Sequence, residues 1–133
     1  MIIRRFDTGV PGIELWQIRW DTFHPIDQAT LKEQFDARQV PVVLDLRALS
    51  LSIDDVQILV TASAAFRQKG KLALVVADQA TLENLTRWGF NDEAALGRVF
   101  LDPVPAIKIL HDAGDRQRVV QTHPKRARLV SGR

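Results

Sequence analysis

The feature of this sequence that most constrains its fold is a short apolar run, Val42 to Leu46, followed by a polar turn and a helical segment. The run is nearly continuous and rich in β-branched residues, which is typical of a strand covered on both faces in a parallel sheet. The acidic pair Asp54-Asp55 opens the segment that follows, whose apolar residues recur at helical spacing. We therefore predict a buried strand followed by a helix that begins at a carboxylate.

Strand and helix patterns alternate at short intervals from residue 25 to residue 111. Such alternation requires right-handed crossovers and a largely parallel sheet. The chain is therefore predicted to be an α/β protein, a small and mostly parallel sheet with helices mainly on one face. The expected strands cover 2–6, 13–20, 42–46, 72–77 and 98–101, and the expected helices cover 27–39, 54–68, 78–89 and 104–111. The alternation slips near Trp16, which permits a bulge in the second strand.

The chain length and composition suit one domain, which we place at residues 1–112. No apolar run approaches the roughly 20 residues that cross a bilayer, and basic residues near the start have no apolar segment behind them. We therefore expect a cytoplasmic protein without a membrane span. The absence of cysteine excludes disulfides, thiolate metal sites and thiol catalysis.

The remaining segment, 113–133, is predicted to be a basic C-terminal tail. Six of the 18 basic residues lie from Arg116 onward with no acid among them, which leaves 12 basic against 16 acidic residues in the rest of the chain. A basic tail on an acidic domain could contact nucleic acid or an acidic partner. No aromatic residue interleaves these charges to stack on bases, so we expect a solvated terminus and no nucleic-acid binding.

The sequence contains no pattern that indicates an enzyme, a metal site or a cofactor. His24, His111 and His123 are scattered, and there is no glycine-rich phosphate loop or defensible pair of nucleophile and base. The pair Asp54-Asp55 lacks a third carboxylate or a histidine within the same turn, which argues against a metal. We expect instead that Asp54 caps the helix and that Asp55 complements its dipole.

The order of elements and residues 42–110 resemble the STAS domain of bacterial anti-sigma factor antagonists. Val42-Val43-Leu44-Asp45-Leu46 is similar to the family's central strand, and residues 54–75 resemble its second helix and next strand. Trp88-Gly89-Phe90 and Val99-Phe100-Leu101 are similar to its later helix end and last strand. The resemblance implies a non-enzymatic regulatory module that binds other proteins.

The functional motif of that family is altered in this chain. Members that exchange partners carry Asp-Ser-Ser-Gly or Asp-Ser-Thr-Gly at the start of the second helix, and the second hydroxyl is phosphorylated. The corresponding residues are Ile53-Asp54-Asp55-Val56, so that hydroxyl position falls on Asp55. A carboxylate cannot accept phosphate as serine does, so we expect no phosphorylation switch at Asp55. Ser52 is the nearest hydroxyl.

The resemblance implies that a protein partner binds around the junction between strand and helix. The implied partner is an anti-sigma factor or kinase, a transport complex or a second copy of the chain. Trp20 is expected to be the most exposed of the three tryptophans. The predicted partner-binding residues are Ser52, Asp54, Asp55, Gln57 and Trp20. The alternative is a small-ligand sensor, a scaffold domain or a residual enzyme with a pocket near the strand ends.

Overall fold

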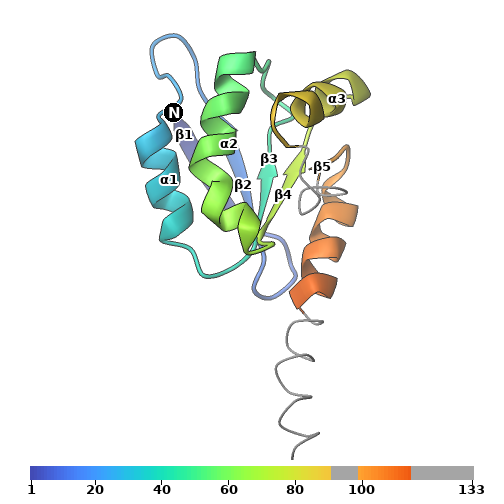
Figure 1. Cartoon of the computed structure of the whole chain (residues 1–133). Helices are drawn as coiled ribbons and strands as arrows, with labels where there is room; N and C mark the ends of the chain where they lie inside the picture. The colour runs from blue at the N-terminus through green and yellow to red at the C-terminus, as the bar shows by residue number, and fades with distance from the viewer. Residues whose placement is uncertain (91–98, 115–133) are drawn as a thin grey trace, which may run out of the picture.

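The computed structural model of this chain describes residues 1–90 and 99–114. The strands are β1 (Ile2–Asp7), β2 (Glu14–Arg19), β3 (Val42–Asp45), β4 (Leu72–Val75) and β5 (Val99–Phe100). The helices are α1 (Gln28–Asp36), α2 (Ile53–Gln68) and α3 (Gln79–Trp88), and a last helix is described over residues 103–114 (Figure 1).

The five strands form one sheet in the order β1-β2-β3-β4-β5. β1 and β2 make an antiparallel hairpin, whereas β2, β3, β4 and β5 run parallel. β3 and β4 are neighbours, with Val42 opposite Leu72 and Asp45 opposite Val75. The structure confirms the predicted α/β class and the mostly parallel sheet.

The helices lie on both faces of the sheet (Figure 1). α1, α2 and α3 bury apolar residues against one face, because consecutive parallel strands joined by right-handed crossovers place their helices on the same side. The helix over 103–114 covers part of the opposite face, where Ala106 and Leu110 pack with Val43, Ala73 and Val75. Placing most helices on one face was therefore correct, but the sequence pattern did not place the last one.

β2 is regular, and the bulge considered near Trp16 is wrong. The pairing with β1 runs without interruption from Ile2 opposite Arg19 to Asp7 opposite Glu14. Trp16 is fully buried under the helices, whereas Leu15 packs on the other face against the second apolar cluster. The adjacent residues Leu15 and Trp16 are both apolar because each face of β2 contacts apolar side chains. The strand itself alternates regularly between the two faces.

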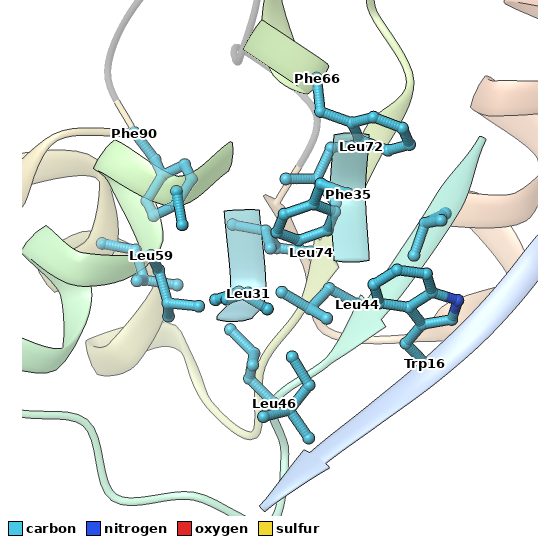
Figure 2. Close-up of a cluster of buried hydrophobic side chains, with 14 of the residues drawn as sticks. Trp16, Leu31, Phe35, Leu44, Leu46, Leu59, Phe66, Leu72, Leu74 and Phe90 are labelled. Carbon is cyan, nitrogen blue, oxygen red and sulfur yellow. The ribbon is translucent and has the colours of Figure 1, made fainter. Parts of the chain in front are cut away.

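The larger core contains a stack of three aromatic rings from three different elements (Figure 2). The Phe35 ring of α1 lies 5.3 Å from that of Trp16 and 5.2 Å from that of Phe66, between centroids. The buried indole N–H of Trp16 donates to Oε1 of Glu14 at 3.0 Å, so its polar atom is satisfied. This stack ties β2, α1 and α2 together.

The ends of the helices are fixed by side chains that the sequence displays. The Asp27, Asp78 and Asp102 carboxylates accept hydrogen bonds from backbone N–H groups of the helical turns that follow them. After α2, Gly70 has a φ of +70°, the left-handed conformation that glycine adopts most easily. The predicted ends of α2 and α3 at Gly70 and Gly89 are confirmed.

The last helix is longer than predicted, since it is described to Gly114. The domain boundary placed after residue 112 therefore falls inside this helix. The predicted basic tail lies outside the described residues from position 115 onward. Within 1–90 and 99–114, no helix combines the length and apolar character needed to span a membrane.

The aromatic stack predicts a large difference between two phenylalanine truncations. Phe35 is fully buried, so Phe35→Ala should lower the free energy of unfolding by about 3–5 kcal/mol. Phe23 is 88% exposed, so Phe23→Ala should change it by less than about 0.5 kcal/mol. Urea denaturation with an unchanged m-value measures both. Losses of similar size would contradict the burial of the stack.

Candidate functional site

The segments that follow the parallel strands leave the sheet at the same end, the upper end in Figure 1. This end carries the loop over 20–27 after β2, the connection over 46–52 between β3 and α2, and the short turns after β4 and β5. In parallel sheets, ligand and partner sites commonly form at this end, because the loops there are free to vary while the strands hold them in place.

The start of α2 is a capping box formed by Ser52 and Asp55. The backbone N–H of Asp55 donates to Oγ of Ser52 at 3.1 Å, and the backbone N–H of Ser52 donates to Oδ2 of Asp55 at 3.2 Å. Each side chain thus satisfies a backbone group that the helix would otherwise leave without a partner. The Asp55 carboxylate also lies in the first turn, where it complements the helix dipole as expected.

The predicted role of Asp54 as the helix cap is wrong, because Ser52 is the N-cap residue. The cap lies two residues earlier because the serine hydroxyl reaches the free N–H of the third helical residue. Asp54 instead lies in the first turn, is exposed, and its side chain has no hydrogen bond or ion pair within the described part of the chain. Of the two carboxylates, Asp54 is the one free to meet a partner.

The other predicted site residues are divided between the surface and the core. Gln57 is exposed on the first turns of α2, and Ile53, which was not predicted, is 47% exposed beside Asp54. Trp20 is half-buried and packs against the main core. The freely exposed aromatic residue of that loop is Phe23, not Trp20.

Exposed apolar side chains concentrate at this end of the sheet. Within the described residues, six large apolar side chains are exposed, and four of them come from the segments that follow the parallel strands. Apolar groups gathered at the end that carries the loops are typical of a surface that contacts another molecule. These four residues are Phe23, Ile53, Leu101 and Val104.

A buried carboxylate at the end of β3 is the most constrained polar group of the site. The Asp45 side chain is 5% exposed and forms a bidentate pair with Arg47, from Nε to Oδ1 at 3.0 Å and from Nη2 to Oδ2 at 2.9 Å. The backbone N–H of Arg47 also donates to Oδ1 at 3.0 Å. A carboxylate is tolerated in this strand because these donors replace the water that burial removes.

These contacts determine the ionisation of Asp45. Burial by itself raises the pKa of the carboxyl, but the hydrogen bonds from the Arg47 side chain and backbone, together with the positive charge of Arg47, more than offset it. The pKa of Asp45 is therefore held below its usual range. In the sequence, Asp45 is only one residue of a strand motif. The signal for this pair was an acid within an apolar run, followed by arginine two residues later.

A cavity of about 270 Å³ adjoins this ion pair. It is lined by Gln17, Ile18, Arg19, Asp45, Arg47 and Ala48, at the carboxyl ends of β2 and β3. None of the five predicted partner-binding residues lines it. Within residues 1–90 and 99–114, no group of three or more histidine and acidic side chains is close enough to hold a metal ion.

Comparisons with the models of known protein families, with curated proteins and with solved structures found no match for this chain. Its function is therefore inferred from its own residues and geometry.

The capping box predicts unequal effects of two substitutions at the start of α2. Ser52→Ala should cost about 1 kcal/mol of stability, the usual effect of losing an N-cap. Asp54→Ala should change stability by no more than about 0.3 kcal/mol, because the lost dipole interaction is offset by the higher helix propensity of alanine. Chemical denaturation of both variants measures the difference, and a larger loss for Asp54→Ala would contradict the assignment of the cap.

The Asp45–Arg47 pair predicts a pH-dependent contribution to stability. A carboxyl whose pKa is lower in the folded state stabilises the fold above its unfolded pKa, and this contribution is lost as the pH falls through the folded pKa. The stability advantage of the wild type over Asp45→Asn should therefore be complete near pH 7 and shrink from about pH 5 downward. Urea denaturation of both proteins across this range measures it. A difference that is independent of pH would show that the Asp45 carboxylate is not stabilised by folding.

Proposed function

We propose that this chain is a non-enzymatic regulatory module of the STAS type that binds a partner protein at the end of the sheet where α2 begins. The observation that carries the proposal is the set of exposed apolar side chains at that end, with an exposed carboxylate among them. An apolar surface with a polar component is the usual composition of a protein-binding patch. The exposed residues at the end of a helix can form such a patch on a surface that has no pocket.

The arrangement of elements supports the STAS resemblance. An N-terminal hairpin is followed by alternating helices and parallel strands, and a helix begins shortly after the central strand β3. This is the place where the resemblance puts the partner-binding motif. Because one fold can serve many functions, the proposal depends on the exposed residues of the junction more than on the topology.

The charge at the junction distinguishes this chain from phosphorylated members of that family. Asp55 occupies the position of their modified hydroxyl, but its carboxylate is bound to the backbone of Ser52. Asp54 is exposed and carries a negative charge that needs no kinase. A fixed acid at this place favours a partner with a basic group opposite it, whether that partner is an anti-sigma factor, a kinase, a transport complex or a second copy of the chain.

The test begins with affinity capture of the full-length protein from its native cell and identification of the protein that co-purifies. The captured partner is then titrated with three variants. Ile53→Ser removes an exposed apolar group and should weaken binding about tenfold or more, since burial of such a side chain is worth roughly 1.5–3 kcal/mol. Asp54→Asn removes one exposed charge and should weaken binding by up to about fivefold.

Glu83→Gln is the matched control, since Glu83 is exposed on α3 and has no hydrogen bond or ion pair within the described residues. It removes the same charge as Asp54→Asn, from a different helix, and should leave the affinity unchanged. Asp55 is a poorer probe, because its replacement also breaks the capping box. Equal affinities for the wild type and all three variants would exclude the start of α2 from the binding surface.

A further inference from the structure

The cavity beside Asp45 belongs to a different surface from the start of α2. Side chains alternate between the two faces of a strand, and Trp16 and Ile18 of β2 point toward α1 and α2. Gln17 and Arg19 therefore point to the opposite face, with Gln17 opposite Asp45 in the register of β2 and β3. The helix over 103–114 covers the β3 and β4 side of that face and packs on Val43, Ala73 and Val75.

The Arg47 guanidinium is held rigidly at the wall of this cavity. Its Nε and one N–H of Nη2 are bound to the two oxygens of the buried Asp45 carboxylate. A guanidinium carries five N–H donors, so three remain, both donors of Nη1 among them. The Arg47 side chain is 44% exposed, which leaves these donors accessible. A fixed and partly exposed guanidinium loses little side-chain entropy when it binds a ligand.

A second arginine of the cavity lacks a counter-charge. Arg19 is exposed, and its side chain has no hydrogen bond or ion pair within the described residues. The same holds for Arg4 of β1, which is opposite Gln17 in the hairpin register and therefore on the same face. These two positive charges lie along one face of the hairpin, and neither forms an ion pair with an acidic side chain of the described residues.

The charges around the cavity sum to a positive value. Asp45 neutralises Arg47, so Arg19 and Arg4 remain unbalanced within the sheet face. Asp102 also acts on Arg47 electrostatically, but it does not line the cavity, and its Oδ1 accepts the backbone N–H of Val104 at 2.7 Å. With the charge of Asp102 included, one positive charge remains in excess.

We propose that this cavity binds a small oxyanion, a carboxylate or phosphate group held between Arg19 and Arg47. Two guanidinium groups, one of them fixed in orientation, form the planar forks of donors that match the oxygens of such an anion. The cavity volume of about 270 Å³ is slightly below the usual range of pockets for drug-sized ligands, which favours a small ligand. An anion site here corresponds to the alternative function predicted from the sequence, a small-ligand sensor with a pocket near the strand ends. It does not depend on partner binding at the start of α2.

In this site Asp45 is a positioning residue. It makes no contact with the anion and holds the Arg47 guanidinium in place from the buried side. Gln17 lies opposite this carboxylate in the register of β2 and β3. Arg19 supplies the unbalanced charge, so the two arginines have separate roles that substitution can distinguish.

The experiment is an NMR titration of the full-length, uniformly ¹⁵N-labelled protein. Sodium phosphate is added in one series and sodium acetate in another, with sodium chloride keeping the ionic strength constant. We expect saturable shifts at the Nε–Hε groups of Arg19 and Arg47 and at the Ala48 amide. Saturation with phosphate alone, with acetate alone or with both identifies which oxyanion class the site accepts.

Arg19→Gln should weaken the binding of the saturating anion at least about tenfold, because it removes a charged hydrogen-bond donor from the anion. The matched control is Arg87→Gln, which makes the same charge change on the exposed surface of α3 and should leave the affinity unchanged. Arg47→Lys keeps the charge but loses the rigid fork, and should weaken binding about fivefold or more. Arg19 is exposed, so its variant remains interpretable even where Arg47→Lys fails to fold.

Three results would overturn the proposal: no saturable shift with either anion, equal shifts with sodium chloride alone, or equal affinities for Arg19→Gln and Arg87→Gln. Asp54→Asn separates this site from the proposed partner surface, because it should weaken partner binding and leave anion binding unchanged. Anion binding without a protein partner would support the anion site and contradict the partner surface. Partner binding without anion binding would support the partner surface and contradict the anion site.

Discussion

The structure depends most on the burial of β3 from both sides. α1 and α2 cover one face of this strand through Val42 and Leu44, and the helix over 103–114 covers the other through Val43. A strand in this position can be almost entirely apolar, and it must pair with a strand on each edge to satisfy its backbone. β2 and β4 provide those pairs. The run Val42 to Leu46 therefore determines the centre of the sheet.

The polar end of the molecule follows from the same constraint. β3 ends at Asp45, a carboxylate that is almost as buried as the apolar residues before it. Such a group is stable only where hydrogen-bond donors surround it, and the turn after β3 supplies three of them from Arg47 alone. The ion pair thus has a structural origin. Its consequence is a guanidinium held in one orientation at the edge of a cavity.

Periodicity was sufficient to predict most of the fold. The alternation of apolar runs with helical spacing predicted the mostly parallel pairing of the strands, because right-handed crossovers leave few other arrangements. It could not place the last helix, whose partner surface is formed by residues far away in the sequence. It also suggested a bulge at Trp16, since periodicity alone does not show that both faces of β2 are covered.

The details of the site were harder to predict, because they depend on geometry within a few residues. Ser52 and Asp54 are both good capping residues, and the sequence does not show which of them has the extended backbone that a cap requires. Trp20 was assigned to the surface from its place at a strand end, yet its ring contacts the core. The Asp45–Arg47 pair requires two side chains to converge across a turn, which spacing permits but does not require.

The two proposed sites share the connection between β3 and α2 but use opposite sides of it. Arg47 lies just after β3 at the cavity, and Ser52 caps α2 five residues later. Between them, Leu49 and Leu51 pack against the main core, and the backbone N–H of Leu49 donates to the carbonyl of Leu46 at 3.1 Å. Because this segment is anchored at its middle, a substitution at one end should not reorganise the other. The partner surface and the anion site are therefore separable by mutation, even though one short connection carries residues of both.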